Sequence, residues 1–240
     1  MPISTVYSDA DNTLWGTDAV YRGAQLRLLE HVESIANLTA QSDDRLTFVR
    51  SYDQAIASRH HQHLRYPPGL LAHALILGLR GVAPGEASSH VLHAGDLPEV
   101  RDAVTEFVTQ LRQPPPLLPG VEEGMRLAAA QGVRLYVVTE GSQDRVAKTL
   151  AQYGFLGQVS QVLSVTKTVD LYRRLKKLAI EGVPAMLGDQ LDRDIIPARE
   201  AGLIAIWIPS AFTPEWADSN QAFRASHVAI SFLDAINWLL

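Results

Sequence analysis

Acidic side chains stand directly after two short apolar runs of this sequence. Asp9 and Asp11 follow the run at residues 3–8, and Asp189 follows the run at residues 184–188. Carboxylates placed so close together repel one another, and they are costly to bury unless a cation or a proton neutralises them. Hard oxygen ligands in a chain without cysteine suit Mg²⁺, which also binds the oxygens of a substrate phosphate. The pattern therefore indicates magnesium-assisted chemistry at a phosphoryl group.

Further candidate residues follow the apolar runs: Thr139, Glu140 and Gly141 follow the run at 133–138, Lys167 follows the run at 159–165, and Asp192 and Asp194 lie just beyond Asp189. Ligands of an open parallel α/β sheet bind beyond the carboxyl ends of its strands. If the apolar runs are strands of one such sheet, these side chains meet in one crevice with Asp9 and Asp11. In such a site one aspartate can attack phosphorus as a nucleophile while its neighbour transfers a proton.

The elements that must position these residues alternate regularly after residue 120. β-Branched and aromatic residues indicate strands, and apolar residues at three- and four-residue spacing indicate helices. The sequence predicts strands at 3–8, 133–139, 159–165, 184–189, 203–209 and 227–230, and helices at 121–132, 142–154, 168–182, 192–202 and 231–240. Strands that alternate with helices form a parallel sheet covered on both faces. We therefore expect an α/β fold with a Rossmann-like parallel sheet.

A helical insertion interrupts this alternation after the first strand. Between residues 17 and 112 the apolar residues recur at helical spacing, and the pattern of no segment there indicates a strand. The proline-rich stretch 113–120 indicates a linker. The expected organisation is a discontinuous α/β core at residues 1–15 and 116–240, with an all-helical domain at residues 16–115.

Four short motifs resemble those of the haloacid dehalogenase (HAD) superfamily. They are DADNT at 9–13, VVTEGS at 137–142, the isolated lysine in SVTKT at 164–168 and GDQLDRD at 188–194. Each motif stands at an expected strand end, and the four occur in the family's order. The resemblance covers the whole core, and it implies that the helical insertion is the family's cap, a lid that closes over small substrates.

The resemblance implies a catalytic role for four residues. Asp9 corresponds to the nucleophile that accepts the phosphoryl group, and Asp11 corresponds to the general acid/base. Thr139 and Lys167 correspond to the hydroxyl and the ammonium group that bind the phosphate. Two alternatives stay open. Thr139 could cap the following helix, and Lys148 competes with Lys167, although Lys148 lies well inside an expected helix.

The resemblance also implies the protein ligands of Mg²⁺. The corresponding groups are the side chains of Asp9, Asp189 and Asp194 and the backbone carbonyl of Asp11. Asp192 competes with Asp194, although the five-residue step from Asp189 to Asp194 fits the family's pattern better.

Glu140 and Gly141 stand beside Thr139, where the resemblance implies contacts with the substrate or its phosphate. Glu140 departs from the asparagine of many relatives and adds a negative charge near the phosphate. A second departure is the threonine that follows Lys167, where the family frequently has proline.

These assignments imply a Mg²⁺-dependent phosphatase that hydrolyses a small phosphorylated metabolite through an aspartyl phosphate on Asp9. A haloacid dehalogenase would lack a proton-transferring carboxylate at position 11. A phosphonate-cleaving relative needs a lysine in the cap, whereas the first lysine of this chain is Lys148. A phosphosugar mutase with the same chemistry and a non-catalytic phosphate-binding protein stay open as alternatives. The substrate does not follow from the sequence, because specificity depends on the placement of cap side chains.

Candidate substrate contacts in the cap lie between residues 50 and 66. Three arginines there could bind a second anionic group of the substrate, and they are Arg50, Arg59 and Arg65. His60 and His63 share a helix face and could hold a metal or face solvent. Trp15, after the first motif, could line the pocket entrance or pack at the cap hinge.

The composition and the N-terminal sequence limit the classes of partner and the cellular location that we expect. The net charge is −5 and no stretch is dense in lysine or arginine, which argues against binding to nucleic acid through its phosphates. The apolar runs are too short to cross a bilayer, so no membrane span is expected. The N-terminal residues lack a basic start and an apolar signal core, which makes a cytoplasmic location the expectation. The oligomeric state does not follow from the sequence.

Overall fold

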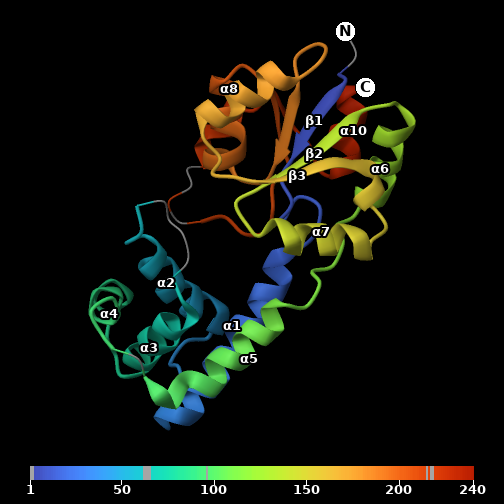
Figure 1. The fold of residues 1–240 in the computed structure, drawn as a ribbon. Coiled ribbons are helices and arrows are strands. Elements are labelled where there is room, and N and C mark those ends of the chain that lie inside the picture. Colours follow the sequence, from blue (N-terminus) through green and yellow to red (C-terminus); the bar gives the residue numbers. More distant parts are fainter. Residues whose placement is uncertain (1–2, 62–65, 96, 215, 217–218) are drawn as a thin grey trace. The chain divides into compact units, whose positions relative to one another are not determined.

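The structure is a computed structural model that describes residues 3–61, 66–95, 97–214, 216 and 219–240. Six parallel strands form one sheet in the order β3-β2-β1-β4-β5-β6 (Figure 1). They are β1 (Thr5–Ser8), β2 (Arg134–Thr139), β3 (Val159–Ser164), β4 (Ala185–Gly188), β5 (Ile204–Trp207) and β6 (His227–Val228). The predicted α/β fold with a parallel sheet is confirmed.

Helices cover both faces of this sheet, as Figure 1 shows. One face carries α6 (Val121–Ala130), α7 (Gln143–Gln152) and α10 (Phe232–Leu239), and the other carries α8 (Val169–Leu178) and α9 (Ile196–Glu200). Successive side chains of a strand point to opposite faces. Within β1, Val6 accordingly joins the apolar cluster of the first face and Tyr7 joins that of the second.

The helical insertion after β1, also predicted, forms its own apolar core. Its helices are α1 (Thr17–Ala36), α2 (Arg45–Ala57), α3 (Pro68–Leu79), α4 (Pro84–Val91) and α5 (Arg101–Leu111), and a short 3₁₀ turn at Pro98–Val100 precedes α5. Buried side chains from all five helices, among them Leu29, Val49, Leu75 and Phe107, pack into one cluster. None of the helices among the described residues is both long and apolar enough to cross a membrane.

The chain forms two compact units, residues 1–18 with 114–240 and residues 19–113. The assignment of residues 16–115 to a cap domain stays a prediction.

The observed elements are mostly a few residues shorter than the predicted ones, as three of them illustrate. The helix predicted at 192–202 begins instead with a π turn at Leu191–Ile195, and only then continues as α9. The strand predicted at 227–230 is shorter, because only His227–Val228 pairs with β5. The helix predicted to reach residue 182 ends at Leu178.

Close packing of α6 on α10 explains why residue 124 is a glycine inside a helix. A Cβ atom at Gly124 would lie 2.6 Å from Cδ1 of Phe232 and 3.2 Å from the backbone of Leu233. We expect Gly124→Ala to lower the free energy of unfolding by about 1–2 kcal/mol, because the clash outweighs the gain in helix propensity. Gly23→Ala, in α1 where a Cβ would meet nothing within 4 Å, is the control and should be neutral or stabilising. Denaturant unfolding of both variants checks this, and an unchanged midpoint for Gly124→Ala would contradict it.

Candidate active site

The neighbouring strands β1 and β4 end side by side, and each is followed by an aspartate. Val6 pairs with Ala185, and the backbone N–H of Asp9 donates a hydrogen bond to the Leu187 carbonyl at 2.8 Å. Asp9 therefore lies at the same sheet edge as Asp189, which directly follows β4.

A tight turn after Asp9 sets the position of Asp11. Asn12 adopts a φ of 59°, in the left-handed region that asparagine tolerates better than most residues. Its side-chain oxygen accepts a hydrogen bond from the backbone N–H of Asp18 at 2.8 Å. Oδ1 of Asp11 in turn accepts hydrogen bonds from Trp15 Nε1 at 3.1 Å and from the Thr17 hydroxyl at 2.5 Å. Trp15 is also buried, so its indole N–H holds the Asp11 carboxylate in a fixed position.

The π turn brings Asp194 back to the end of β4. The N–H of Ile195 donates to the Gln190 carbonyl five residues earlier, at 3.3 Å. Oδ2 of Asp194 accepts a hydrogen bond from the backbone N–H of Gln190 at 3.1 Å. A Cβ atom at Gly188 would lie 2.4 Å from Cγ of Asp194, so only glycine leaves room for this carboxylate.

Lys167 connects two of the carboxylates. Its ammonium group donates to Oδ1 of Asp9 and to Oδ1 of Asp194, the latter at 2.6 Å, and its side chain is 5% exposed. Lys148, the sequence competitor, lies exposed on α7. The structure therefore places Lys167, and not Lys148, beside Asp9.

Asp9, Asp189 and Asp194 form a group that fits a divalent cation. One carboxylate oxygen from each lies within 4.8 Å of the others, and all three residues are buried. Neither carboxylate oxygen of Asp189 has a hydrogen-bond partner among the described residues, and the nearby Ser210 hydroxyl donates instead to the Phe212 carbonyl at 2.9 Å. Buried carboxylate oxygens without donors are what a bound Mg²⁺ would satisfy.

Burial and mutual repulsion shift the pKa values of these acids upward. Burial raises the pKa of Asp9 to about 7, against the lowering effect of Lys167. Burial raises the pKa of Asp189 well above its usual range, and the charges of Asp9 and Asp194 raise it further. Burial also raises the pKa of Asp194, although Lys167 opposes the shift. Burial lowers the pKa of Lys167, but Asp194 and Asp9 outweigh this and hold it well above its ordinary value. Lys167 alone therefore does not balance the three carboxylates, and without a metal the cluster tends to hold protons instead.

Thr139 and Gly141 form a compact corner after β2. The Thr139 hydroxyl is buried and accepts a hydrogen bond from the Gly141 N–H at 2.9 Å. A Cβ atom at Gly141 would lie 3.9 Å from Oδ2 of Asp11, so this corner and the first motif are close together. The N-cap of α7 is Ser142, which accepts a hydrogen bond from the Arg145 N–H, so Thr139 is not the capping residue.

Glu140 has partners inside the protein. Oε1 accepts a hydrogen bond from the backbone N–H of Lys167 at 3.0 Å, and Oε2 pairs with the guanidinium group of Arg193. The sequence suggested Glu140 for a substrate contact. In the structure both of its carboxylate oxygens instead bind groups of the protein itself.

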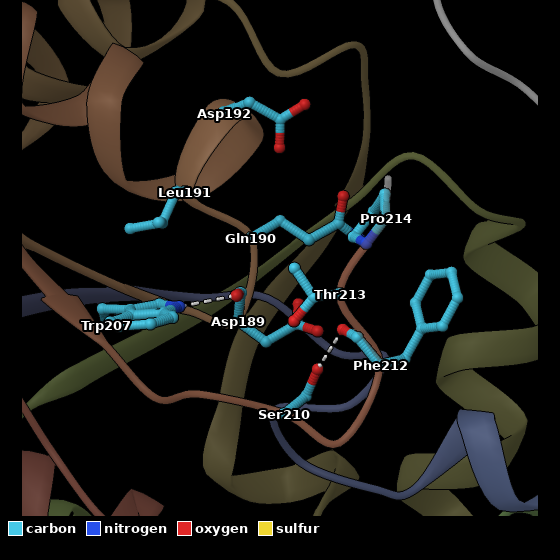
Figure 2. Close-up of a pocket in the computed structure, with 9 residues that line it drawn as sticks. All are labelled: Asp189, Gln190, Leu191, Asp192, Trp207, Ser210, Phe212, Thr213 and Pro214. Atoms are coloured by element: carbon cyan, nitrogen blue, oxygen red, sulfur yellow. Dashed lines mark hydrogen bonds between the residues drawn. The ribbon is translucent and has the colours of Figure 1, made fainter. Parts of the chain in front are cut away.

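The two acidic residues that compete in the fourth motif have different surroundings. Asp192 is exposed, whereas Asp194 is 1% exposed and lies in the acidic group. Figure 2 shows Asp192 directed away from Asp189, which faces Ser210 and Thr213. Asp189, Ser210 and Thr213 are among the residues that line a cavity of about 20 Å³, enough for about one water molecule.

The candidate cap residues make contacts within the helical unit. The guanidinium group of Arg59 donates to the Ser88 hydroxyl at 3.3 Å and to the Gly85 carbonyl at 3.0 Å. His60 stacks on His61 with ring centres 4.5 Å apart. His63 and Arg65 lie outside the described residues.

Sequence reasoning missed three residues that shape the site. Gly188 makes room for Asp194, Arg193 pairs with Glu140, and Trp207 Nε1 donates to the Asp189 carbonyl at 2.7 Å. Only Gly188 had a signal in the sequence, as a glycine between a strand and an acidic residue.

Comparisons with known proteins agree with this architecture. A family described as haloacid dehalogenase-like hydrolase matches residues 3–202. A phosphoserine phosphatase of Thermus thermophilus is 28% identical over 148 residues. That alignment covers 58% of this chain and 59% of the relative, so the chain spans about three fifths of its length.

Two solved structures share the fold at low identity. YfnB of Bacillus subtilis, assigned to the HAD hydrolases and solved with magnesium bound, matches with a TM-score of 0.65 and 14% identity over 100% of this chain and 99% of its own. A haloacid dehalogenase-like family hydrolase of Xanthomonas campestris matches with a TM-score of 0.63 and 19% identity over 99% of this chain and 92% of its own.

The contact between Gly188 and Asp194 can be tested by substitution. Gly188→Ala places a methyl group where Asp194 lies and displaces this carboxylate. We expect Mg²⁺ affinity, measured by calorimetry, to fall by about 10–100-fold. Gly157→Ala, where a Cβ would meet nothing within 4 Å, is the control and should bind as the wild type does. Wild-type affinity in Gly188→Ala would contradict the assignment.

The raised pKa of Asp9 predicts how stability depends on pH when metal is absent. The pKa of the Asp9 carboxyl group rises from 3.8 to about 7 on folding, so the protonated group contributes its full stabilisation at pH values below its pKa in the unfolded chain. That stability is lost as the pH rises through about 7. In chelator, we expect the free energy of unfolding to fall by roughly 1–3 kcal/mol between pH 5 and pH 8. Asp9→Asn should reduce this slope in parallel denaturant titrations, and a wild-type stability that rises over the same range would overturn the interpretation.

Proposed function

The chain belongs to the haloacid dehalogenase-like hydrolases, and we propose that it is a phosphatase that hydrolyses a small phosphate monoester with Mg²⁺. The observation that carries this proposal is the buried acidic group of Asp9, Asp189 and Asp194 in contact with Lys167. The Thermus relative named as a phosphoserine phosphatase and the magnesium bound to YfnB support the same chemistry.

Asp9 is the proposed nucleophile of the first step. One of its oxygens attacks phosphorus, and the bond between phosphorus and the leaving oxygen breaks. Asp11, protonated at this stage, gives its proton to the leaving oxygen, so that a neutral alcohol departs. Thr17 and Trp15 hold Oδ1 of Asp11, and its other oxygen lies toward the Gly141 corner.

Water completes the reaction in the second step. It attacks the phosphorus of the aspartyl phosphate, and Asp11, now a carboxylate, takes a proton from the water. The bond between phosphorus and the Asp9 oxygen breaks, which restores the carboxylate and releases inorganic phosphate.

The remaining residues bind and neutralise the phosphoryl group. The Lys167 ammonium and the Thr139 hydroxyl bind its oxygens, and the Gly141 N–H, which donates to the Thr139 hydroxyl oxygen, holds that hydroxyl in place. Asp9, Asp189, Asp194 and the backbone carbonyl of Asp11 would hold Mg²⁺, which would supply positive charge against the negative charge of the phosphoryl group. The helical unit is proposed to act as the cap and to select the substrate.

Dependence on metal follows directly from this assignment. We expect chelator-treated protein to be inactive toward p-nitrophenyl phosphate and to recover with Mg²⁺. Ca²⁺ should restore little activity, because its larger and looser coordination shell disturbs the geometry of transfer. Full turnover in excess chelator would contradict the proposal. Release of inorganic phosphate from a natural phosphate ester also separates a phosphatase from a mutase, which returns the phosphoryl group to the sugar.

The separate roles of Asp9 and Asp11 can be read from pre-steady-state kinetics. Nitrophenolate leaves without a proton, so Asp11→Asn should still phosphorylate Asp9 but hydrolyse the intermediate slowly. We expect a burst of about one nitrophenol per active site followed by a slow steady state. Asp9→Asn should show no burst. A burst from Asp9→Asn, or wild-type turnover by Asp11→Asn on natural esters, would show that the assigned roles are wrong.

A further inference from the structure

Glu140 connects the three loops that carry the proposed phosphate and metal residues. It directly follows Thr139 at the end of β2. One of its oxygens holds the backbone N–H of Lys167, in the loop after β3, at 3.0 Å. The other pairs with Arg193, in the π turn after β4. One side chain therefore fixes the relative positions of three strand ends.

Each partner of Glu140 adjoins a residue of the acidic group. The Lys167 side chain contacts Asp9 and Asp194, so its backbone must be fixed for the ammonium group to reach both. Arg193 immediately precedes Asp194 in the chain, and its backbone carbonyl accepts a hydrogen bond from the buried Tyr172 hydroxyl at 3.2 Å. Displacement of Glu140 would therefore disturb the phosphate-binding lysine and a metal-binding carboxylate together.

The charge of Glu140 needs a counterion in this position. A carboxylate next to Thr139 would repel the phosphate that Thr139 is proposed to bind. The guanidinium group of Arg193 pairs with this carboxylate, and the side chains are 17% exposed for Arg193 and 21% exposed for Glu140, although Glu140 with its backbone included is an exposed residue. The pair thus supplies a hydrogen-bond acceptor for Lys167 without a net negative charge.

We propose that Glu140 and Arg193 form a positioning pair for the reaction of this site. Glu140 holds the Lys167 backbone, and Arg193 cancels the charge that this acceptor brings near the phosphate. The role rests on the proposed phosphatase function, and it replaces the substrate contact that the sequence suggested for Glu140.

Four variants separate the charge of the pair from its hydrogen bond. Arg193→Gln leaves the Glu140 charge uncompensated, and the double variant Glu140→Gln/Arg193→Gln removes both charges. Glu140→Gln keeps an acceptor for the Lys167 N–H, whereas Glu140→Ala removes it. Arg126→Gln, which breaks the exposed Glu122–Arg126 ion pair of 2.9 Å on α6, is the matched control. The affinity for inorganic phosphate in Mg²⁺ and the kcat and KM for p-nitrophenyl phosphate are measured for each variant, with the unfolding midpoint.

The charge role predicts rescue by a second substitution. We expect Arg193→Gln to weaken phosphate binding and raise KM by about five- to tenfold, with a smaller change in kcat. The double variant should return both values to within about twofold of the wild type, because the site is again neutral. Arg126→Gln should change neither. If the double variant binds phosphate as poorly as Arg193→Gln, the charge role is wrong.

The hydrogen-bond role predicts a difference between the two substitutions of Glu140. Glu140→Ala should lower kcat by about tenfold, while Glu140→Gln should keep it within about threefold of the wild type. Equal kcat values for these two variants, or a loss that only follows the unfolding midpoint, would overturn the positioning role. If wild-type protein binds phosphate but hydrolyses no ester, the proposed function fails while the binding comparison still decides the charge role. If wild-type protein hydrolyses esters but the rescue fails, only the positioning pair is wrong.

Discussion

Repulsion among three buried carboxylates is the constraint on which the rest of this structure depends. Asp9, Asp189 and Asp194 lie within 4.8 Å of one another, and Lys167 contacts only two of them by hydrogen bonds. Burial raises the pKa values of all three carboxyl groups, and the one ammonium group of Lys167 opposes this without cancelling it. A bound cation would offset this repulsion, and a phosphoryl group with its own negative charge could then bind beside it. Binding of metal and binding of substrate are thus two parts of one electrostatic problem.

The parallel sheet makes such a cluster possible without a buried loop. Because β1, β2, β3 and β4 are adjacent and parallel, their carboxyl ends deliver side chains from distant parts of the sequence to one edge. Local devices complete the geometry there. Asn12, in the left-handed conformation, reverses the chain so that Trp15 and Thr17 reach the Asp11 carboxylate. Gly188 and the π turn leave room for the Asp194 side chain at the end of β4. The fold supplies the meeting point, and these turns supply the orientation.

Much of this arrangement could be predicted from the sequence, for identifiable reasons. Strand periodicity located the four strand ends, and the rule that ligands bind there made Asp9, Asp189 and Lys167 candidates without knowledge of their distances. The π turn could not be predicted, because a helical pattern from 192 onward does not reveal a widened first turn. The partners of Glu140 were equally hidden, since its pairing with Arg193 joins residues 53 positions apart through side-chain packing. The residue types near a strand end indicate which chemistry is available. The side-chain contacts that adjust their charge and position come from residues far apart in the sequence and appear only in the folded structure.

We propose that this electrostatic arrangement makes Asp9 a metal-dependent nucleophile toward phosphorus. The most direct measurement is rapid acid quench of the wild-type protein during turnover of radiolabelled p-nitrophenyl phosphate, followed by peptide mapping. We expect a base-labile label on the peptide that contains Asp9 when Mg²⁺ is present, and no label in chelator. A label on another residue, equal labelling in chelator, or turnover with no labelled peptide at any quench time would contradict it.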